Sequence, residues 1–238
     1  GGLGTRFGEY KIPKPLITVG KYPIIFHIMQ LYSHYKHNDF IICLGYEPNH
    51  FKELFHQALK EFDGPSEDWN IIFVETPPSY NVGQRLKTLE PYIQPNELFM
   101  AAYGDNICDV NLDEYVQFFN QHSAIASFLS VPVPQTYQAV ALDEQNNISL
   151  LQPINSINLY IDGGFFIFRQ EFFHYINDGE EILEQPFQRL LKENKLITYK
   201  YTHGFFQPMD TWKEKKGLDE MVHNQTTPWQ QWTLIQNS

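Results

Sequence analysis

Short apolar runs alternate with stretches of helical periodicity through the first half of the chain. The runs end at glycine or at polar turn residues, which is typical of β-strands buried on both faces; they cover residues 16–19, 40–44, 70–74 and 98–103. Between them, apolar residues recur every three or four positions and predict amphipathic helices. This alternation predicts parallel β-α units, with helices covering both faces of one sheet.

Three helices are expected in this first half. Pro23 is suited to the first position of a helix, and Asn49 is suited to cap the next one. A short third helix is predicted near residues 85–87. The side chains expected to face inward on the first two helices are Ile25, Ile28, Met29, Tyr32 and Tyr35, and Phe51, Leu54, Phe55, Ala58 and Leu59.

The pattern changes in the second half, after a helix near 112–119 and a strand near 124–131. Short strands follow at 139–142, 148–151 and 160–168, and we expect them to be antiparallel and to line one side of a ligand site. A helix over 180–192, a strand over 196–201 and a helix over 213–222 close the chain. The inward side chains of the 180–192 helix are expected to be Leu183, Phe187, Leu190 and Leu191.

The length of 238 residues and a hydrophobic content of 42% allow one large core, and we expect a single α/β domain with a small antiparallel subregion. Cys43 and Cys108 lie in apolar runs and lack CxxC spacing, so they are interpreted as buried hydrophobic residues of a reducing, cytoplasmic compartment. No apolar run approaches the ~20 residues that a transmembrane helix needs.

Charge is distributed unevenly. The chain has 17 basic and 28 acidic residues, a net charge of −11, which disfavours nucleic acid or an anionic membrane as partner. Residues 1–21 hold four basic residues and one acidic residue, a local +3, and the remaining 13 basic and 27 acidic residues sum to −14. This arrangement favours a small anionic ligand near the start of the chain.

The first residues have the composition of a phosphate-binding loop. Glycines let backbone N–H groups approach an anion, and a hydroxyl and cations follow them in Thr5, Arg6, Lys11 and Lys14. An ordinary turn would explain the glycines but not the cations. Because such loops usually follow a β-strand, we expect a first strand, within about ten residues ahead of Gly1.

Ligands of parallel sheets bind at the carboxyl ends of the strands. Residues 1–6, Gly45, Tyr46, Gly104 and Asp105 are expected to meet there. Asp105 follows an apolar strand and Asp210 lies in a later loop, so the two carboxylates would suit Mg²⁺. A turn-forming role explains either aspartate equally well when it is taken alone. A Ser-His-Asp hydrolase is not supported, because the sequence has no GxSxG motif.

Several segments, in order over nearly the whole chain, resemble the glucose-1-phosphate cytidylyltransferase family of sugar nucleotidyltransferases. They are Gly1-Gly2-Leu3-Gly4-Thr5-Arg6, Lys14-Pro15, Asp39-Phe40-Ile41-Ile42-Cys43 with Gly45-Tyr46, Tyr103-Gly104-Asp105, Gly163-Gly164-Phe165-Phe166, Gly204 to Thr211, and Pro228-Trp229. The resemblance implies a three-layer, Rossmann-like fold of the nucleotide-diphospho-sugar transferase type, Mg²⁺ as cofactor, and a homo-oligomer. It also implies transfer of CMP from CTP to a sugar 1-phosphate with release of pyrophosphate.

The resemblance implies a role for each matching residue. Arg6 and Lys14 would be catalytic, and Asp105 and Asp210 would hold Mg²⁺. The nucleotide would be bound by Gly2, Leu3, Gly4, Thr5, Arg6, Gly83, Arg85, Tyr103 and Gly104, and the acceptor by Gln152, Asp162, Gly163 and Gly164. Residues 1–132 would thus form mainly the nucleotide-binding part, and residues 133–238 mainly the acceptor-binding part with the closing helix. The alternative to a nucleotide-binding role for Arg85 is an exposed position on a helix.

The sequence departs from the family pattern where the acceptor is expected to bind. The family's Glu-Lys-Pro is Leu151-Gln152-Pro153 here, and its asparagine before Gly163 is Asp162. Val82 and Gln84 replace a threonine and a glycine in the cytosine-contacting segment. The nucleotide half therefore matches better than the acceptor half.

Two hypotheses remain open. The first is an active cytidylyltransferase with an altered acceptor, which the retained Lys14, Asp105 and Asp210 favour. The second is a nucleotide-binding or sugar-nucleotide-binding homologue with little activity, which the loss of the Glu-Lys pair favours. A glycosyltransferase on a related fold is a weaker third, because the sequence lacks a DxD motif.

Overall fold

A computed structural model describes residues 12–133 and 137–230. Its central sheet has the strand order β11-β7-β10-β5, with β10 antiparallel to both neighbours and β11 parallel to β7. The bounds of these strands are Leu98–Ala102 for β5, Ala126–Pro132 for β7, Tyr160–Arg169 for β10 and Leu196–Lys200 for β11. The predicted mixed α/β class is therefore confirmed, with antiparallel pairing inside the main sheet itself.

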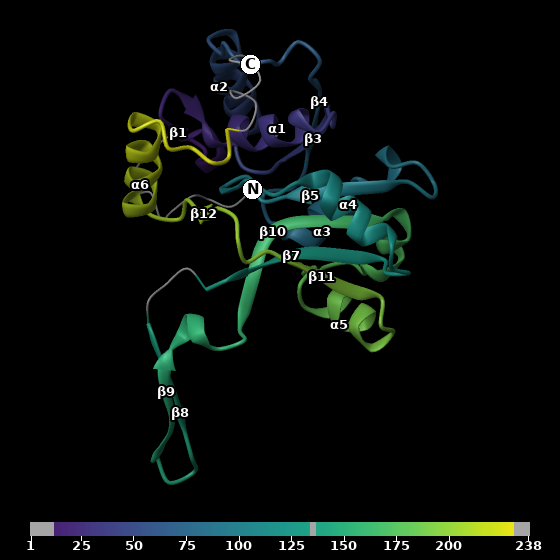
Figure 1. Cartoon of the computed structure of the whole chain (residues 1–238). Helices are drawn as coiled ribbons and strands as arrows, with labels where there is room; N and C mark the ends of the chain where they lie inside the picture. Colours follow the sequence, from purple (N-terminus) through teal and green to yellow (C-terminus); the bar gives the residue numbers. More distant parts are fainter. Residues whose placement is uncertain (1–11, 134–136, 231–238) are drawn as a thin grey trace.

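Helices cover both faces of this sheet and give the three predicted layers (Figure 1). One core includes residues of α1 (Ile24–His34) and α4 (Leu112–Asn120), and the other includes residues of α3 (Val82–Lys87) and α5 (Gln185–Lys192). The second core is rich in phenylalanine, including Phe166, Phe168, Phe172 and Phe187, all at most 4% exposed. Hydrophobic burial on both faces fixes the position of the sheet between the helices.

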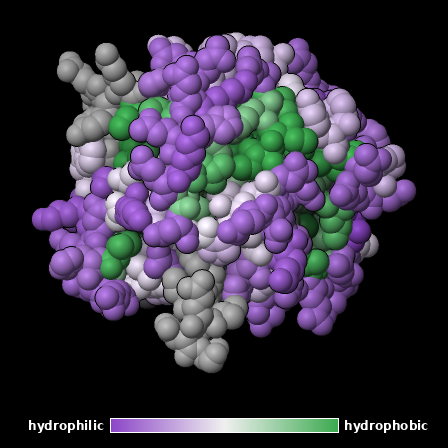
Figure 2. All heavy atoms as spheres, turned by 90° about the horizontal axis from the view of Figure 1, so that it is seen from above, coloured by the Kyte–Doolittle hydropathy of each residue, from purple (hydrophilic) through white to green (hydrophobic). Residues whose placement is uncertain are grey.

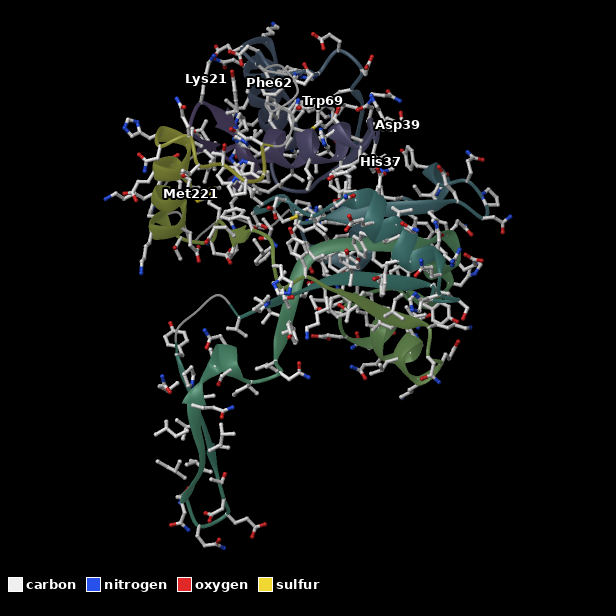
Figure 3. The ribbon with its side chains drawn as sticks, in the orientation of Figure 1. Lys21, His37, Asp39, Phe62, Trp69 and Met221 are labelled. Carbon is white, nitrogen blue, oxygen red and sulfur yellow. The ribbon has the colours of Figure 1, made fainter. Side chains whose placement is uncertain are left out.

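Strands β3 (Asp39–Leu44) and β4 (Asn70–Glu75) form a separate parallel pair. Helix α2 (Pro48–Lys60) packs on it, and Phe51, Phe55 and Phe73 belong to one hydrophobic cluster. Phe62 and Trp69, labelled in Figure 3, stack with ring centroids 5.5 Å apart in the same cluster. Apolar side chains also reach the surface seen in Figure 2, where they lie among hydrophilic ones.

A groove separates β3 from β5. Among the described residues, β3 pairs only with β4 and β5 pairs only with β10, and both strands line the groove. Their side chains nevertheless contribute to the same two cores: Phe40 and Met100 to one, and Ile41 and Phe99 to the other. The prediction that β3 and β4 are buried was therefore wrong for most of their residues, since only Leu44 and Val74 are buried.

Helix α1 is more deeply buried than an amphipathic pattern predicts. Its first nine residues, including His27 and Gln30, are all buried, because the helix is enclosed by β2 (Tyr22–Pro23), β6 (Asn106–Cys108) and the N-terminal 3-10 turn η2 (Lys14–Leu16). Pro23 is its N-cap residue and not its first helical residue. Helix α2 begins at Pro48 after a left-handed Glu47, so the prediction of Asn49 as its cap was wrong.

The C-terminal elements differ from the prediction in detail. Helix α5 begins at Gln185, five residues later than expected, and Leu183 and Leu191 are 38% and 55% exposed instead of facing inward. Helix α6 (Trp212–His223) packs on β1 (Thr18–Val19), and its Leu218 joins a small core with Trp229. None of the helices in the described residues is long and apolar enough to cross a membrane.

Strands β8 (Gln138–Leu142) and β9 (Ile148–Pro153) form a separate antiparallel ribbon that extends away from the sheet (Figure 1). The ribbon was expected to line the ligand site, but none of its residues lines the groove. Val140 is paired with Leu151, and Leu142 with Ile148, and each of the four side chains is more than half exposed.

The two cysteines are free thiols, as expected. Cys108, in β6, is fully buried, and burial raises the pKa of its thiol. Cys43, in β3, is only partly buried because β3 borders the groove, and burial raises its pKa to about 11. Both thiols therefore stay protonated at neutral pH, which suits packing residues and not nucleophiles.

The imidazole of His27 joins the end of the described chain to β1. Its Nε2 lies 3.0 Å from the carbonyl oxygen of Val19, and its Nδ1 accepts a hydrogen bond from the indole Nε1 of Trp229 at 3.2 Å. Nε2 therefore carries the proton and donates to Val19. Burial lowers the pKa of His27 to about 4 although the backbone contacts oppose this.

The neutral His27 makes stability depend on pH. Below pH ~6.5 the unfolded chain, with a histidine pKa near 6.5, takes up a proton that the folded protein excludes. The free energy of unfolding is therefore unaffected by His27 above pH ~6.5 and falls by up to about 3 kcal/mol as the pH falls toward ~4. In urea unfolding, the free energy of unfolding should fall less between pH 7.5 and pH 4.5 in His27→Gln than in the unsubstituted protein. The exposed His174 provides the control variant His174→Gln. Equal pH slopes for His27→Gln and the unsubstituted protein would contradict this account.

Candidate active site

The lining of the groove between β3 and β5 includes polar side chains at the carboxyl ends of these strands. The volume of the groove is about 1980 Å³, larger than the ~300–1,000 Å³ typical of small-molecule pockets, because it includes the channel between the strands. The polar lining includes Lys14, Arg85, Tyr103, Asp105 and Asp210. Gly45, Tyr46 and Gly104 line it as well, as the sequence predicted.

Asp105 and Asp210 are brought together by a short antiparallel pair. Strand β6 begins directly after Asp105, and β12 (Phe206–Pro208) ends shortly before Asp210. The register pairs Pro208 with Asn106, and the N–H of Met209 donates to the carbonyl oxygen of Asp105 at 2.9 Å. The backbone thereby places two carboxylates from distant parts of the sequence in contact with the same side chain.

That side chain is Lys14. Its Nζ lies 2.6 Å from Asp105 Oδ2 and 2.6 Å from Asp210 Oδ1. Lys14 opens the turn η2, with Pro13 before it and Pro15 after it; each proline fixes its own φ, and Pro15 also restricts the backbone conformation of Lys14. Pro15 packs against Gly104, where an added Cβ would lie 3.2 Å from the proline ring. The lysine is therefore anchored at its backbone.

Lys14 is charged in this arrangement. Burial lowers the pKa of its ammonium, but hydrogen bonds and charge attraction from Asp105 and Asp210 outweigh burial and raise the pKa above its usual value. The lysine side chain is 17% exposed, against 28% for Asp105 and 43% for Asp210. The three groups form a partly buried network with one positive and two negative charges.

Asp210 is further positioned by Glu214 at the start of α6. The Glu214 carboxylate accepts from the backbone N–H of Asp210 at 2.7 Å and from that of Thr211 at 2.8 Å. The Thr211 side chain in turn accepts from the N–H of Glu214, which completes a capping box. Sequence reasoning missed Glu214, although the Thr-x-x-Glu spacing ahead of a helix is a recognisable signal.

Arg85 is nearly buried, with 8% of its surface exposed, so it is not the exposed helix residue of the alternative interpretation. Its Nη1 donates to Thr76 Oγ1 at 2.6 Å, and its Nε donates to the carbonyl oxygen of Tyr80 at 3.0 Å. Thr76 donates to the carbonyl oxygen of Leu44, which links the loop to the end of β3. A Cβ on Gly45 would lie 2.4 Å from Arg85 Nη1, so the guanidinium lies directly over a glycine backbone.

Tyr103 and Asp162 form a second polar contact in the groove. The tyrosine hydroxyl hydrogen-bonds the Asp162 carboxylate, whose Oδ1 also accepts from the N–H of Gly164 at 2.8 Å. Burial raises the pKa of Asp162, while these hydrogen bonds lower it and only partly offset the burial. Burial, followed by the charges of Asp162 and Glu181, raises the pKa of Tyr103. Tyr103 is therefore a hydrogen-bond donor at neutral pH.

A family model for nucleotidyl transferases matches residues 1–213. The chain belongs to this family. The glucose-1-phosphate cytidylyltransferase of Salmonella typhi is 31% identical over 250 residues, which cover 98% of this chain and 97% of that protein. This similarity shows that the protein is a nucleotidyltransferase enzyme of the kind that the sequence motifs predicted.

Solved structures show the fold of the family. A Bacillus anthracis structure described as a glucose-1-phosphate thymidylyltransferase has a TM-score of 0.71 at 19% identity and covers 94% of this chain and 92% of its own. The inositol-1-phosphate CTP transferase from T. maritima has a TM-score of 0.68 at 14% identity, and the match covers 97% of this chain and 93% of that one. The predicted nucleotide-diphospho-sugar transferase fold is thereby confirmed.

The structure brings together only some of the residues that were predicted for this nucleotidyltransferase. Lys14, Arg85, Asp105, Asp162 and Asp210 line one groove, together with Tyr103 and Gly104. The loop residues Gly2, Leu3, Gly4, Thr5 and Arg6 lie outside the described residues. Gln152, on β9, is not part of the groove lining.

The predicted glycines are packing positions next to the groove. A Cβ on Gly83 would lie 2.1 Å from the carbonyl oxygen of Glu180, so this glycine lets α3 approach the 180 segment. Gly163 and Gly164 are buried in an irregular part of β10, where the pairing with β7 shifts register between Asp162 and Phe166. Gly164 also holds the Asp162 carboxylate through its backbone N–H.

The site suits a hard divalent cation that is shared with a phosphate ligand. Within the described residues there is no cluster of three or more histidine, cysteine or acidic side chains that could hold a metal alone. Mg²⁺ commonly binds to one or two carboxylates, and substrate phosphates and water complete its coordination. Asp105 and Asp210 supply such a pair, so the residues present fit Mg²⁺ bound together with a nucleotide.

Gly164 should be essential to this part of the fold. Its φ is +74°, and an added Cβ would lie 2.5 Å from both Asn106 Nδ2 and Tyr103 Cδ2. Gly164→Ala is expected to reduce the free energy of unfolding by about 2–4 kcal/mol, measured by urea denaturation. Gly217, inside α6 with open space around it, is the matched control. Gly217→Ala should raise stability by about 0.5–1 kcal/mol; equal effects of the two substitutions would contradict the steric argument.

Proposed function

We propose that this nucleotidyltransferase transfers CMP from CTP to a sugar 1-phosphate and releases pyrophosphate. The observation that carries the proposal is the network of Lys14, Asp105 and Asp210 at the carboxyl ends of the strands, where it lines the groove with Arg85. The identity to a glucose-1-phosphate cytidylyltransferase over nearly the full length supports CTP and glucose 1-phosphate as the first substrates to test.

In this proposal an oxygen of the sugar 1-phosphate attacks the α-phosphorus of CTP. A new P–O bond forms to the acceptor, and the bond between the α-phosphorus and the pyrophosphate oxygen breaks in line with it. The Lys14 ammonium would neutralise charge on the α-phosphate, with Arg6 contributing from the glycine loop. Mg²⁺, held by Asp105 and Asp210, would supply further charge neutralisation on the phosphates.

The remaining predicted residues have binding roles in the proposal. Gly2, Leu3, Gly4 and Thr5 would hold the triphosphate through backbone N–H groups. Gly83 and Arg85 would face the cytosine base, and Tyr103 and Gly104 would line the nucleotide site. In this role Arg85 would also hold the loop over residues 76–80, through its hydrogen bonds to Thr76 and to the carbonyl oxygen of Tyr80. Gln152, Asp162, Gly163 and Gly164 would serve the acceptor.

A second candidate function is a nucleotide-binding homologue of low activity. The observation in its favour is that Leu151 and Gln152 replace the family's acidic and basic acceptor residues and lie on a ribbon outside the groove. Pyrophosphate release with CTP, Mg²⁺ and a panel of sugar 1-phosphates separates the two candidates, with UTP, dTTP and ATP as controls. CTP binding without release for any acceptor would support the second candidate.

Asp105→Asn should abolish metal-dependent pyrophosphate release. Loss of one carboxylate of the metal site is expected to reduce kcat at least about 100-fold, because charge stabilisation by a metal contributes several kcal/mol. Asp63→Asn is the matched control, since Asp63 is an exposed carboxylate paired with Lys21. The control should keep full activity. Unchanged release in Asp105→Asn would remove this residue from the mechanism.

Gln152→Lys tests whether β9 reaches the acceptor. If the ribbon contacts the acceptor phosphate, the new charge-assisted hydrogen bond should lower KM for glucose 1-phosphate by about 10-fold or more, with KM for CTP unchanged. Gln138→Lys, at the paired end of β8, is the control for added charge on the ribbon. Equal KM values for Gln152→Lys and its control would contradict acceptor binding by Gln152 and would favour Asp162 as the acceptor contact.

A further inference from the structure

Asp162 is a partly buried carboxylate of the groove with two uncharged hydrogen-bond partners. It lines the groove from β10, where its Oδ1 accepts from the N–H of Gly164 at 2.8 Å and the hydroxyl of Tyr103 donates to the same carboxylate. Among the residues that the structure describes, no basic side chain forms an ion pair with it. Asp105, by contrast, forms an ion pair with Lys14.

The packing around these two donors fixes the position of the carboxylate. The ring of Tyr103 lies against the backbone of Gly164, where an added Cβ would be 2.5 Å from Tyr103 Cδ2. The same ring packs edge-on against Phe166, with ring centroids 5.4 Å apart. A ligand therefore meets a carboxylate whose geometry is set before the ligand binds, which reduces the entropic cost of binding.

The remaining acceptor capacity of Asp162 is available to a donor on a ligand. A carboxylate offers about four lone-pair positions, and only part of this capacity is used by Tyr103 and Gly164. Burial raises the pKa of Asp162, and the two uncharged donors offset this effect only in part. A positively charged donor would favour the ionised carboxylate, and its hydrogen bonds are roughly twice as strong as those of a neutral donor.

We propose that Asp162 makes this enzyme select an acceptor that carries an ammonium group, namely an amino-sugar 1-phosphate. The inference rests on the proposed function of the site as a sugar-1-phosphate nucleotidyltransferase. An alkyl amine is protonated at neutral pH, so an amino sugar brings a positive charge to the carboxylate, whereas a sugar hydroxyl group brings none.

The groove carries both charges that such a zwitterionic acceptor needs. Lys14 offers positive charge for phosphate, and Asp162 offers negative charge for the ammonium group. These two residues contact opposite ends of one three-residue segment, because Asp162 contacts Tyr103 and Lys14 contacts Asp105. The backbone between two such positions spans at most about 7 Å. One small ligand can therefore meet both charges.

The test is calorimetric titration of the full chain with sugar 1-phosphates, in the presence of Mg²⁺ and saturating α,β-methylene-CTP, whose bridge cannot be cleaved. The probes are glucose 1-phosphate and its 2-, 3-, 4- and 6-amino-deoxy derivatives. At least one amino derivative should bind about 10-fold more tightly than glucose 1-phosphate, and N-acetylation of its amine should remove the gain. Binding of glucose 1-phosphate as tight as that of every amino derivative would overturn the inference.

Asp162→Asn removes the charge and keeps the shape of the side chain. In this variant the dissociation constants of the preferred amino derivative and of glucose 1-phosphate should come within about twofold of each other. Asp68→Asn, at an exposed carboxylate outside the groove lining, is the matched control and should keep the preference. A preference kept in full by folded Asp162→Asn would show that another group recognises the amine, contrary to the proposal.

Tyr103→Phe is a second variant that keeps the proposal testable if Asp162→Asn does not fold, and circular dichroism reports the folding of each. It removes one uncharged donor and leaves the carboxylate, so the preference for the amino derivative should be kept or increased. Loss of the preference in folded Tyr103→Phe would assign the selection to the hydroxyl and contradict the role of Asp162.

The titrations also separate this inference from the proposed function. Failure of every sugar 1-phosphate to bind would contradict the proposed function itself. Binding of glucose 1-phosphate with no gain from any amine would contradict only the selection of an ammonium group.

Discussion

The antiparallel pairing of β6 with β12 is the constraint on which the site depends. It lies outside the main sheet and contains only three residue pairs, yet it joins the segment after β5 to the segment before α6. Without it, Asp105 and Asp210 would belong to separate loops. With it, a lysine from the N-terminal turn has two carboxylates to bind, and the start, middle and end of the described chain meet in one network.

Two residues, Asn106 and Gly164, support this pairing by joining β6 to the neighbouring strand β10. Asn106, the first residue of β6, donates from its side chain to the carbonyl oxygen of Gly163 at 3.1 Å. Gly164 then has no room for a side chain against Asn106 and Tyr103. The segment that carries Asp105 is thus connected to the irregular part of β10 through the side chain of Asn106, and this close packing requires glycines at positions that do not line the groove.

Much of the fold could be predicted from the sequence, because hydrophobic periodicity reports which face of an element is buried. It located α1, β3, β4 and β5 and the alternation that gives a layered α/β protein. It failed where burial depends on distant partners: α1 is enclosed on all sides, whereas Leu191 on α5 is 55% exposed. Helix starts were misplaced where a left-handed residue such as Glu47 precedes the helix, since backbone conformation of this kind leaves little trace in composition.

The site was predicted in part for a similar reason. Glycine and aspartate at a strand end indicated Gly104 and Asp105, Asp210 was proposed as a second carboxylate from a later loop, and the family resemblance supported both acids. The pairing of both acids with Lys14 could not be foreseen, because it depends on the register of two short strands that have no strong sequence pattern. The position of Gln152 outside the groove was equally unpredictable, since it follows from the direction in which a two-stranded ribbon leaves the sheet.

The groove between β3 and β5 also bears on how strands can pair in the central layer. In the described residues, each of these strands presents one row of backbone N–H and C=O groups to the groove, next to apolar side chains that serve both cores. Such an edge accepts an added strand readily. Among the described residues, the central layer thus combines a row of backbone hydrogen-bonding groups on each side of the groove with apolar side chains that serve both cores, an arrangement that one further strand between β3 and β5 would complete.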